Sequence, residues 1–140
     1  MGAPPAGSAP RLLRAHVHLF VLVVPVMYRL APLRWLLRLA TPPERLAPYR
    51  NVPAETILSI VSRRLRRPRL MRRRPCLRKG LTLFHFLRLA GLRPQLHFGV
   101  FAPAPHARRC RAHCWLTLDN RALADAPQEP CAEVLVYPPE

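Results

Sequence analysis

The segment 76–90 carries apolar side chains on almost every face of a helix, and this feature constrains the fold of the chain most. Only a narrow stripe through Arg78, Thr82 and His85 is polar. A helix that is apolar nearly all round is stable in water only when other elements cover it on several sides. We therefore expect segment 76–90 to be a central helix around which the rest of the chain is built. Its apolar positions are Leu77, Leu81, Leu83, Phe84, Phe86, Leu87 and Leu89.

The chain before this helix shows helical periodicity in three pieces. The apolar positions predict helices over about 11–30, 33–40 and 54–66. Residues 1–10 are rich in Gly, Ala and Pro and are predicted to form a disordered leader. Residues 11–55 are accordingly expected to form a helical N-terminal region.

The longest apolar run, residues 15–28, raises the question of a membrane span or a signal peptide. The run holds fourteen residues and is interrupted by Pro25 and two histidines, whereas a membrane span needs about 20 apolar residues. Arg29 and Arg34 follow the run with no small-residue cleavage site between, which disfavours a signal peptide. We expect a buried or surface-lying helix, no membrane span and a cytoplasmic protein.

The chain after the central helix changes to strand-like alternation. Gly91 is placed to end the helix and Pro94 to turn the chain. The expected fold class is α+β, with N-terminal helices and then a helix packed on a small antiparallel sheet, and residues 56–137 are expected to form the core domain. The predicted strands are 95–101, 110–118, 121–126 and 134–137.

The formal net charge of +16 requires an explanation. Lys79 is the single lysine among 23 basic residues, and the excess of Arg, Ala, Pro and Leu is typical of a GC-rich genome. The stretch 56–118 contains fifteen Arg or Lys and no Asp or Glu, so it should attract acidic partners. A basic nucleic-acid-binding protein remains an alternative, although the sequence shows no binding motif and its aromatics lie in apolar stretches.

Cys76 and His113 are the residues with the clearest chemical potential. Cys76 opens the central helix behind Pro75, and the unpaired N–H groups of a helix N-terminus favour the reactive thiolate form of a cysteine. Basic residues flank it at 72–74 and 78–79. His113 lies in the predicted strand 110–118, from which it can serve the thiol as a base.

The remaining cysteines and histidines suggest zinc as a rival interpretation. The Cys and His residues show none of the regular spacings of zinc sites. In addition, alternation along a strand places His113 on the opposite face from Cys110 and Cys114. The four cysteines also lack the spacing of a disulfide framework and are expected to be reduced. No metal and no cofactor is predicted. The possible ligands are His106, Cys110, His113, Cys114 and Cys131.

Three ordered blocks, residues 74–92, 96–100 and 112–119, resemble the leader-peptidase B protein family of lasso-peptide biosynthesis, which belongs to the transglutaminase-like cysteine hydrolases. The resemblance covers about residues 56–126. It implies a transglutaminase-like or papain-like core. It also implies a catalytic triad of Cys76, His113 and Asp125.

The resemblance further implies the reaction and the partners. A cysteine peptidase of this type removes the leader from a ribosomally made precursor peptide. A separate leader-recognition protein and a macrolactam synthetase act in the same pathway, and a chain of 140 residues leaves little room for its own recognition domain. Transglutaminase-like amide chemistry on another substrate is the alternative reaction. Two positions depart from the family pattern: Gly80, where members often carry Ser, and Cys114, where they often carry Ala.

The assignment of Asp125 depends on how the chain returns after strand 110–118. Asp119 lies six residues beyond His113, about 20 Å along an extended strand, and is too far away. Asp125 reaches the face of His113 only if the turn has three residues or the returning strand contains a bulge. We expect one of these, so that the carboxylate fixes the imidazole; Glu129 or Glu133 would otherwise serve. Trp115 is expected in the core.

Overall fold

The computed structural model of the chain describes residues 9–67, 75–106 and 108–139. The helices are α1 (Ala9–Leu30), α2 (Leu33–Ala40), α3 (Ala54–Leu65) and α4 (Pro75–Leu89). The strands are β1 (Gln95–Phe101), β2 (Ala112–Leu118), β3 (Arg121–Ala124) and β4 (Cys131–Tyr137). Every expected element is present. The predicted disordered leader lies outside the described residues except for its last two, which begin α1.

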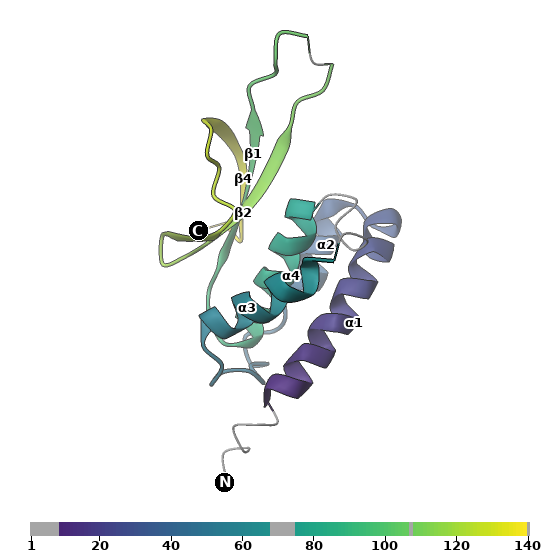
Figure 1. Ribbon diagram of the computed structural model, residues 1–140, viewed down its shortest axis with the longest axis vertical. Coiled ribbons are helices and arrows are strands. Elements are labelled where there is room, and N and C mark those ends of the chain that lie inside the picture. The colour runs from purple at the N-terminus through teal and green to yellow at the C-terminus, as the bar shows by residue number, and fades with distance from the viewer. Residues whose placement is uncertain (1–8, 68–74, 107, 140) are drawn as a thin grey trace.

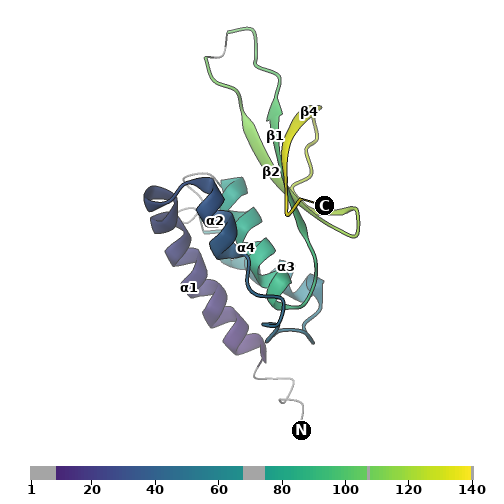
Figure 2. The ribbon, with the colours of Figure 1, turned by 180° about the vertical axis from the view of Figure 1, so that it is seen from behind.

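Helix α4 occupies the centre of the molecule, as its sequence predicts. It contacts α1, α2 and α3 on one side and strands β1 and β2 on the other. Figures 1 and 2 show the resulting arrangement, in which the helices form one layer and the sheet the other, with the β1–β2 hairpin projecting beyond the helices. Phe84, Phe86 and Leu87 are fully buried in the shared core. The expected α+β fold is therefore confirmed.

The sheet places the strand that bears His113 next to an edge. Its strand order is β3-β2-β1-β4, and all three pairings are antiparallel. Because β3 is a four-residue edge strand, the chain leaving β3 lies beside β2 at the side of the sheet. This edge is where His113 and Asp125 come into contact.

Helix α1 buries one face and exposes another. Leu13, Val17 and Val21 are at most 1% exposed, whereas Leu19 and Val26 on the outer side are 60% and 55% exposed. The stretch 11–30 is also long enough and apolar enough to cross a membrane, and 22% of its most apolar 18-residue window is buried in this structure. The helix predicted from apolar periodicity is present, and it extends further than the fourteen-residue apolar run.

The polar stripe of α4 is buried rather than solvated. Thr82 is fully buried and its hydroxyl donates to the Arg78 carbonyl at 2.7 Å. His85 contacts the Ala40 carbonyl through Nδ1 at 3.0 Å and stacks on Phe20, and burial lowers the pKa of its imidazole. These contacts give His85 a structural role, because they fix its ring between α4, α2 and α1.

The two departures from the family pattern, Gly80 and Cys114, face each other across the contact of α4 and β2. A β-carbon on Gly80 would lie 2.8 Å from Sγ of Cys114 and 3.0 Å from Cδ1 of Leu96. Such a separation is too short for ordinary packing. The missing side chain at position 80 therefore provides the space that the cysteine sulfur fills.

This contact predicts strong coupling between the two positions. Gly80→Ser should lower the free energy of unfolding by roughly 1–3 kcal/mol through overpacking, and Cys114→Ala should lower it by leaving a void. The double variant should recover most of the loss, because the smaller alanine side chain on β2 leaves room for the serine on α4. Urea unfolding of the four proteins measures the coupling, and strictly additive losses would contradict it.

Candidate active site

Cys76 lies in the first turn of α4, where the sequence places it. Its side chain is half-buried and packs against the edge of the core. The backbone N–H groups of a first helical turn have no partner within the helix and can face a negative charge. The basic residues expected to assist it are placed differently: 72–74 lie outside the described residues, Arg78 is buried, and Lys79 is bound to Asp125.

Strand β2 places its alternate residues on opposite faces of the sheet. Cys114 is 3% exposed and Leu116 is 1% exposed, and both point toward α4. Burial raises the pKa of the Cys114 thiol far above its ordinary value, and the negative charges of Cys76 and Asp125 raise it further. Cys114 is therefore held as an unreactive thiol close to Cys76 and Asp125.

His113 lies on the other face of β2, in a stack of rings. Its ring stacks on Trp115 with centroids 6.1 Å apart, and Trp115 stacks on His97 at 5.3 Å. Trp115 is half-buried and lies outside the core cluster, so its predicted core position is wrong. The reason is alternation: the core face of β2 is occupied by Cys114 and Leu116, which leaves Trp115 on the outer face.

His97 anchors this stack, a role that sequence reasoning missed. Its Nδ1 contacts Oε2 of Glu133 at 2.8 Å, and its Nε2 contacts Oγ1 of Thr117 at 2.8 Å. The pairing of His97 with Trp115 across β1 and β2 brings the rings together. The pairing of His97 with Trp115 across the two strands could have revealed this ring stack, but predicting that pairing requires the register of β1 against β2.

The return from β2 to β3 contains the expected bulge. Asp119 and Asn120 form a two-residue turn with φ angles of 50° and 62°, a left-handed conformation that Asp and Asn tolerate. Leu118 pairs with Arg121, but the register then shifts between Leu116 and Thr117. One extra residue in β3 brings Asp125 alongside the face of His113.

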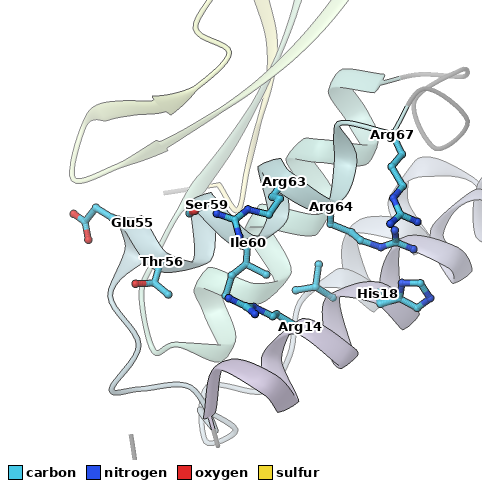
Figure 3. Close-up of a pocket in the computed structure, with 10 residues that line it drawn as sticks. Arg14, His18, Glu55, Thr56, Ser59, Ile60, Arg63, Arg64 and Arg67 are labelled. Carbon is cyan, nitrogen blue, oxygen red and sulfur yellow. The ribbon is translucent and has the colours of Figure 1, made fainter. Parts of the chain in front are cut away.

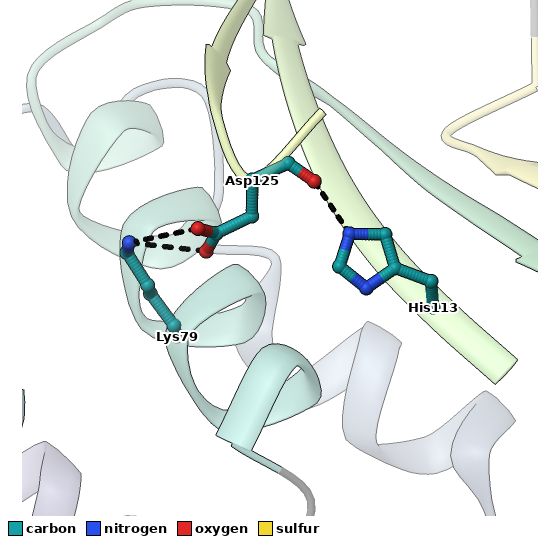
Figure 4. Close-up of polar contacts among 3 residues, drawn as sticks. All are labelled: Lys79, His113 and Asp125. Carbon is teal, nitrogen blue, oxygen red and sulfur yellow. Dashed lines mark hydrogen bonds and ion pairs between the residues drawn. The ribbon is translucent and has the colours of Figure 1, made fainter. Parts of the chain in front are cut away.

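Asp125 joins α4 to His113, although through different groups from those expected. Its carboxylate contacts Nζ of Lys79 at 3.0 and 3.2 Å, whereas its main-chain carbonyl lies 2.5 Å from Nε2 of His113 (Figure 4). A φ angle of 55° at Asp125 turns the chain so that these two groups point apart. Because a carbonyl only accepts, this contact places the proton of a neutral His113 on Nε2 and leaves Nδ1 unprotonated.

A shallow cavity of about 260 Å³ lies beside His113 and Asp125. The side chains of Phe101 and Arg111 and the segment 126–129 complete its lining. Glu129, an alternative orienter from the sequence, binds Arg111 at 3.0 Å instead. Glu133, the other alternative, binds His97. Both glutamates therefore have a partner other than His113.

The structure brings His113 and Asp125 into contact. Cys76 lies one helical turn before Gly80, and Gly80 packs against Cys114, the neighbour of His113 on β2. No hydrogen bond joins the Cys76 thiol to the His113 ring, both of which are described. The arrangement supplies a cysteine at a helix N-terminus and a histidine with a fixed tautomer at one edge of the sheet. Within the described ranges, no three His, Cys, Asp or Glu side chains gather closely enough to hold a metal ion.

Comparison with known proteins identifies the family. A family model described as the transglutaminase-like superfamily matches residues 20–134. Comparison with curated proteins and with solved structures gives no significant match. The matched stretch covers most of the chain and includes α4, the first three strands and all three candidate residues. The chain therefore belongs to the transglutaminase-like superfamily, whose members are typically enzymes resembling cysteine proteases.

Proposed function

We propose that this chain is a cysteine peptidase that removes the leader from a ribosomally made precursor peptide during lasso-peptide biosynthesis. The observation that supports the proposal is that Asp125, directly after β3, contacts His113 on β2 and also Lys79, which lies one helical turn after Cys76 on α4. Cys76, His113 and Asp125 lie on or directly after these three elements, within a fold whose family uses cysteine chemistry.

In the proposed reaction, the Cys76 thiolate attacks the scissile carbonyl and forms a tetrahedral intermediate. The C–N bond breaks as His113 donates a proton to the leaving amine, which gives a thioester between Cys76 and the leader. Water then hydrolyses the thioester with His113 as the base. Catalytic hydrogen bonds are often longer in a free enzyme and shorten with substrate bound, so the Cys76–His113 contact is expected to close on substrate binding.

Asp125 is proposed to orient His113 through its main-chain carbonyl. A hydrogen bond from Nε2–H keeps Nδ1 free to exchange protons with the thiol. The carboxylate fixes the turn by binding Lys79 on α4. This proposal retains Asp125 as the third member of the site but assigns the orienting role to its backbone.

The lasso-peptide assignment is supported by the three ordered sequence blocks that contain the site. A separate leader-recognition protein and a macrolactam synthetase are the proposed partners, in the cytoplasm. The exposed apolar side chains of α1 and α2 offer a surface for the recognition protein, and an interface of that kind commonly has an apolar centre. These side chains include Leu19, Leu22, Val26, Trp35 and Leu39.

The test is cleavage of a precursor peptide encoded beside this gene, with the product masses measured in the presence and absence of the neighbouring recognition protein. Release of an intact leader with a free core amine is expected. If an added primary amine is instead incorporated at a glutamine of the peptide, the chain performs transglutaminase-like amide transfer. If neither reaction occurs, and an oligonucleotide binds with the steep salt dependence of phosphate contacts, the nucleic-acid alternative is favoured.

A further inference from the structure

A second, larger cavity lies between α1 and α3, within the helical layer and apart from the candidate active site. Its volume is about 750 Å³, in the range of cavities that bind ligands. Figure 3 shows that its side chains come from α1, from α3 and from the residues just after α3, all distant in sequence from β2 and β3. None of Cys76, His113 and Asp125 lines this cavity.

Four arginines converge on this cavity without acidic partners. Arg14 extends from α1, and Arg63, Arg64 and Arg67 extend from α3 and the residues after it (Figure 3). None of the ion pairs found in the described part of the chain involves any of the four. Glu55 is the single acidic residue in the lining. Like charges held together without counterions repel one another, so the cavity favours an anionic occupant.

Arg64 adds a second, independent indication of a missing partner. Its Nε is buried and has no hydrogen-bond partner among the described residues. A buried donor left without an acceptor is unfavourable. An oxyanion satisfies both the donor and the charge, because a guanidinium presents parallel N–H groups that match a carboxylate.

The rest of the lining indicates which kind of anion fits. Val17 and Ile60 supply apolar surface, and Thr56 and Ser59 supply hydroxyls. No Phe, Tyr or Trp is among the lining residues, whereas proteins that bind single-stranded nucleic acids stack bases on such rings. The mixture of arginines, hydroxyls and aliphatic side chains suits a peptide segment that alternates acidic and apolar residues.

We propose that the cavity between α1 and α3 binds an acid-rich segment of the peptide substrate, away from the bond that is cleaved. The end of α3, which carries Arg64, and the start of α4, which carries Cys76, lie at the same end of the helical layer (Figures 1 and 3). A peptide bound between α1 and α3 can therefore extend toward Cys76. The statement that the bound peptide is the substrate rests on the proposed function. The statement that the cavity binds an acidic peptide does not depend on it.

The experiment measures binding of a fluorescent twelve-residue peptide of alternating Glu and Leu to the full chain by anisotropy. Arg63→Gln combined with Arg67→Gln is expected to weaken binding about tenfold or more, because both guanidinium groups are exposed and replaceable without loss of the core. Arg108→Gln combined with Arg109→Gln removes the same charge from the exposed loop after β1 and is expected to weaken binding less than about twofold. Arg64→Gln tests the buried donor separately, and thermal unfolding confirms that each variant is folded.

Three further binding measurements distinguish an acidic peptide in this cavity from the alternative explanations. A peptide with Gln in place of Glu should bind at least about tenfold more weakly, because it lacks the charge that the arginines attract. If the two pairs of arginine substitutions weaken binding equally, the cavity is not the binding site and the peptide is attracted only by the net charge of the protein. If an oligonucleotide binds more tightly than the peptide, and its binding depends on the cavity arginines, the ligand is not an acidic peptide. Cys76→Ala should bind the acidic peptide normally while failing to cleave, so loss of binding and loss of catalysis are read separately.

Discussion

Cys76→Ala is expected to abolish peptide cleavage, with a fall in kcat of about 10⁴-fold or more, while the protein remains folded. Removal of a nucleophile eliminates the covalent route and leaves only the weak effects of binding and orientation. The side chain is half-buried at a helix start and contributes little to the core, and alanine is compatible with a first helical turn. The measurement is single-turnover cleavage by mass spectrometry together with the midpoint of thermal unfolding.

Two other cysteines provide the controls for this result. Cys110→Ala changes an exposed thiol and should leave both cleavage and stability unchanged. Cys114→Ala should keep cleavage near the wild-type rate despite reduced stability, because burial holds that thiol protonated by raising its pKa. Normal turnover in Cys76→Ala, or inactivity confined to Cys114→Ala, would show that the wrong thiol has been assigned.

His113→Gln is expected to lower the rate of the chemical step by about 10³-fold, the usual size of a general acid–base contribution. Glutamine retains a donor toward the Asp125 carbonyl but cannot exchange a proton with Cys76. The stack on Trp115 is lost as well, and the cost in stability should be small because the ring is partly exposed. His106→Gln, in the exposed loop after β1, is the matched control and should have no effect on the cleavage rate.

The Asp125→Asn variant tests whether the main-chain carbonyl or the side-chain carboxylate of Asp125 orients His113. Asparagine tolerates the left-handed φ of 55° and retains the carbonyl that contacts His113. The ion pair with Lys79 is partly exposed and is worth at most about 1 kcal/mol. The rate should therefore fall by no more than about tenfold, and a loss matching that of His113→Gln would mean that the carboxylate turns to the imidazole during catalysis.

The sequence by itself determined the order and approximate bounds of the elements, because apolar periodicity is a local property. The all-round apolar character of 76–90 required a central helix, and α4 is that helix. Gly91, with a φ of 78°, ends it as its position suggests. The sequence also located Cys76 at a helix start and His113 on a neighbouring strand, since both placements follow from these local patterns.

Only the tertiary structure decided which groups meet. The bulge in β3 was one of two alternatives that the sequence left open, and the turn at Asp125 decided that its carbonyl, and not its carboxylate, reaches His113. The ring stack through Trp115 and His97 depends on strand register, and the arginine cavity depends on α1 packing beside α3. These features join residues far apart in the chain, so their geometry follows from long-range packing that no local sequence pattern encodes.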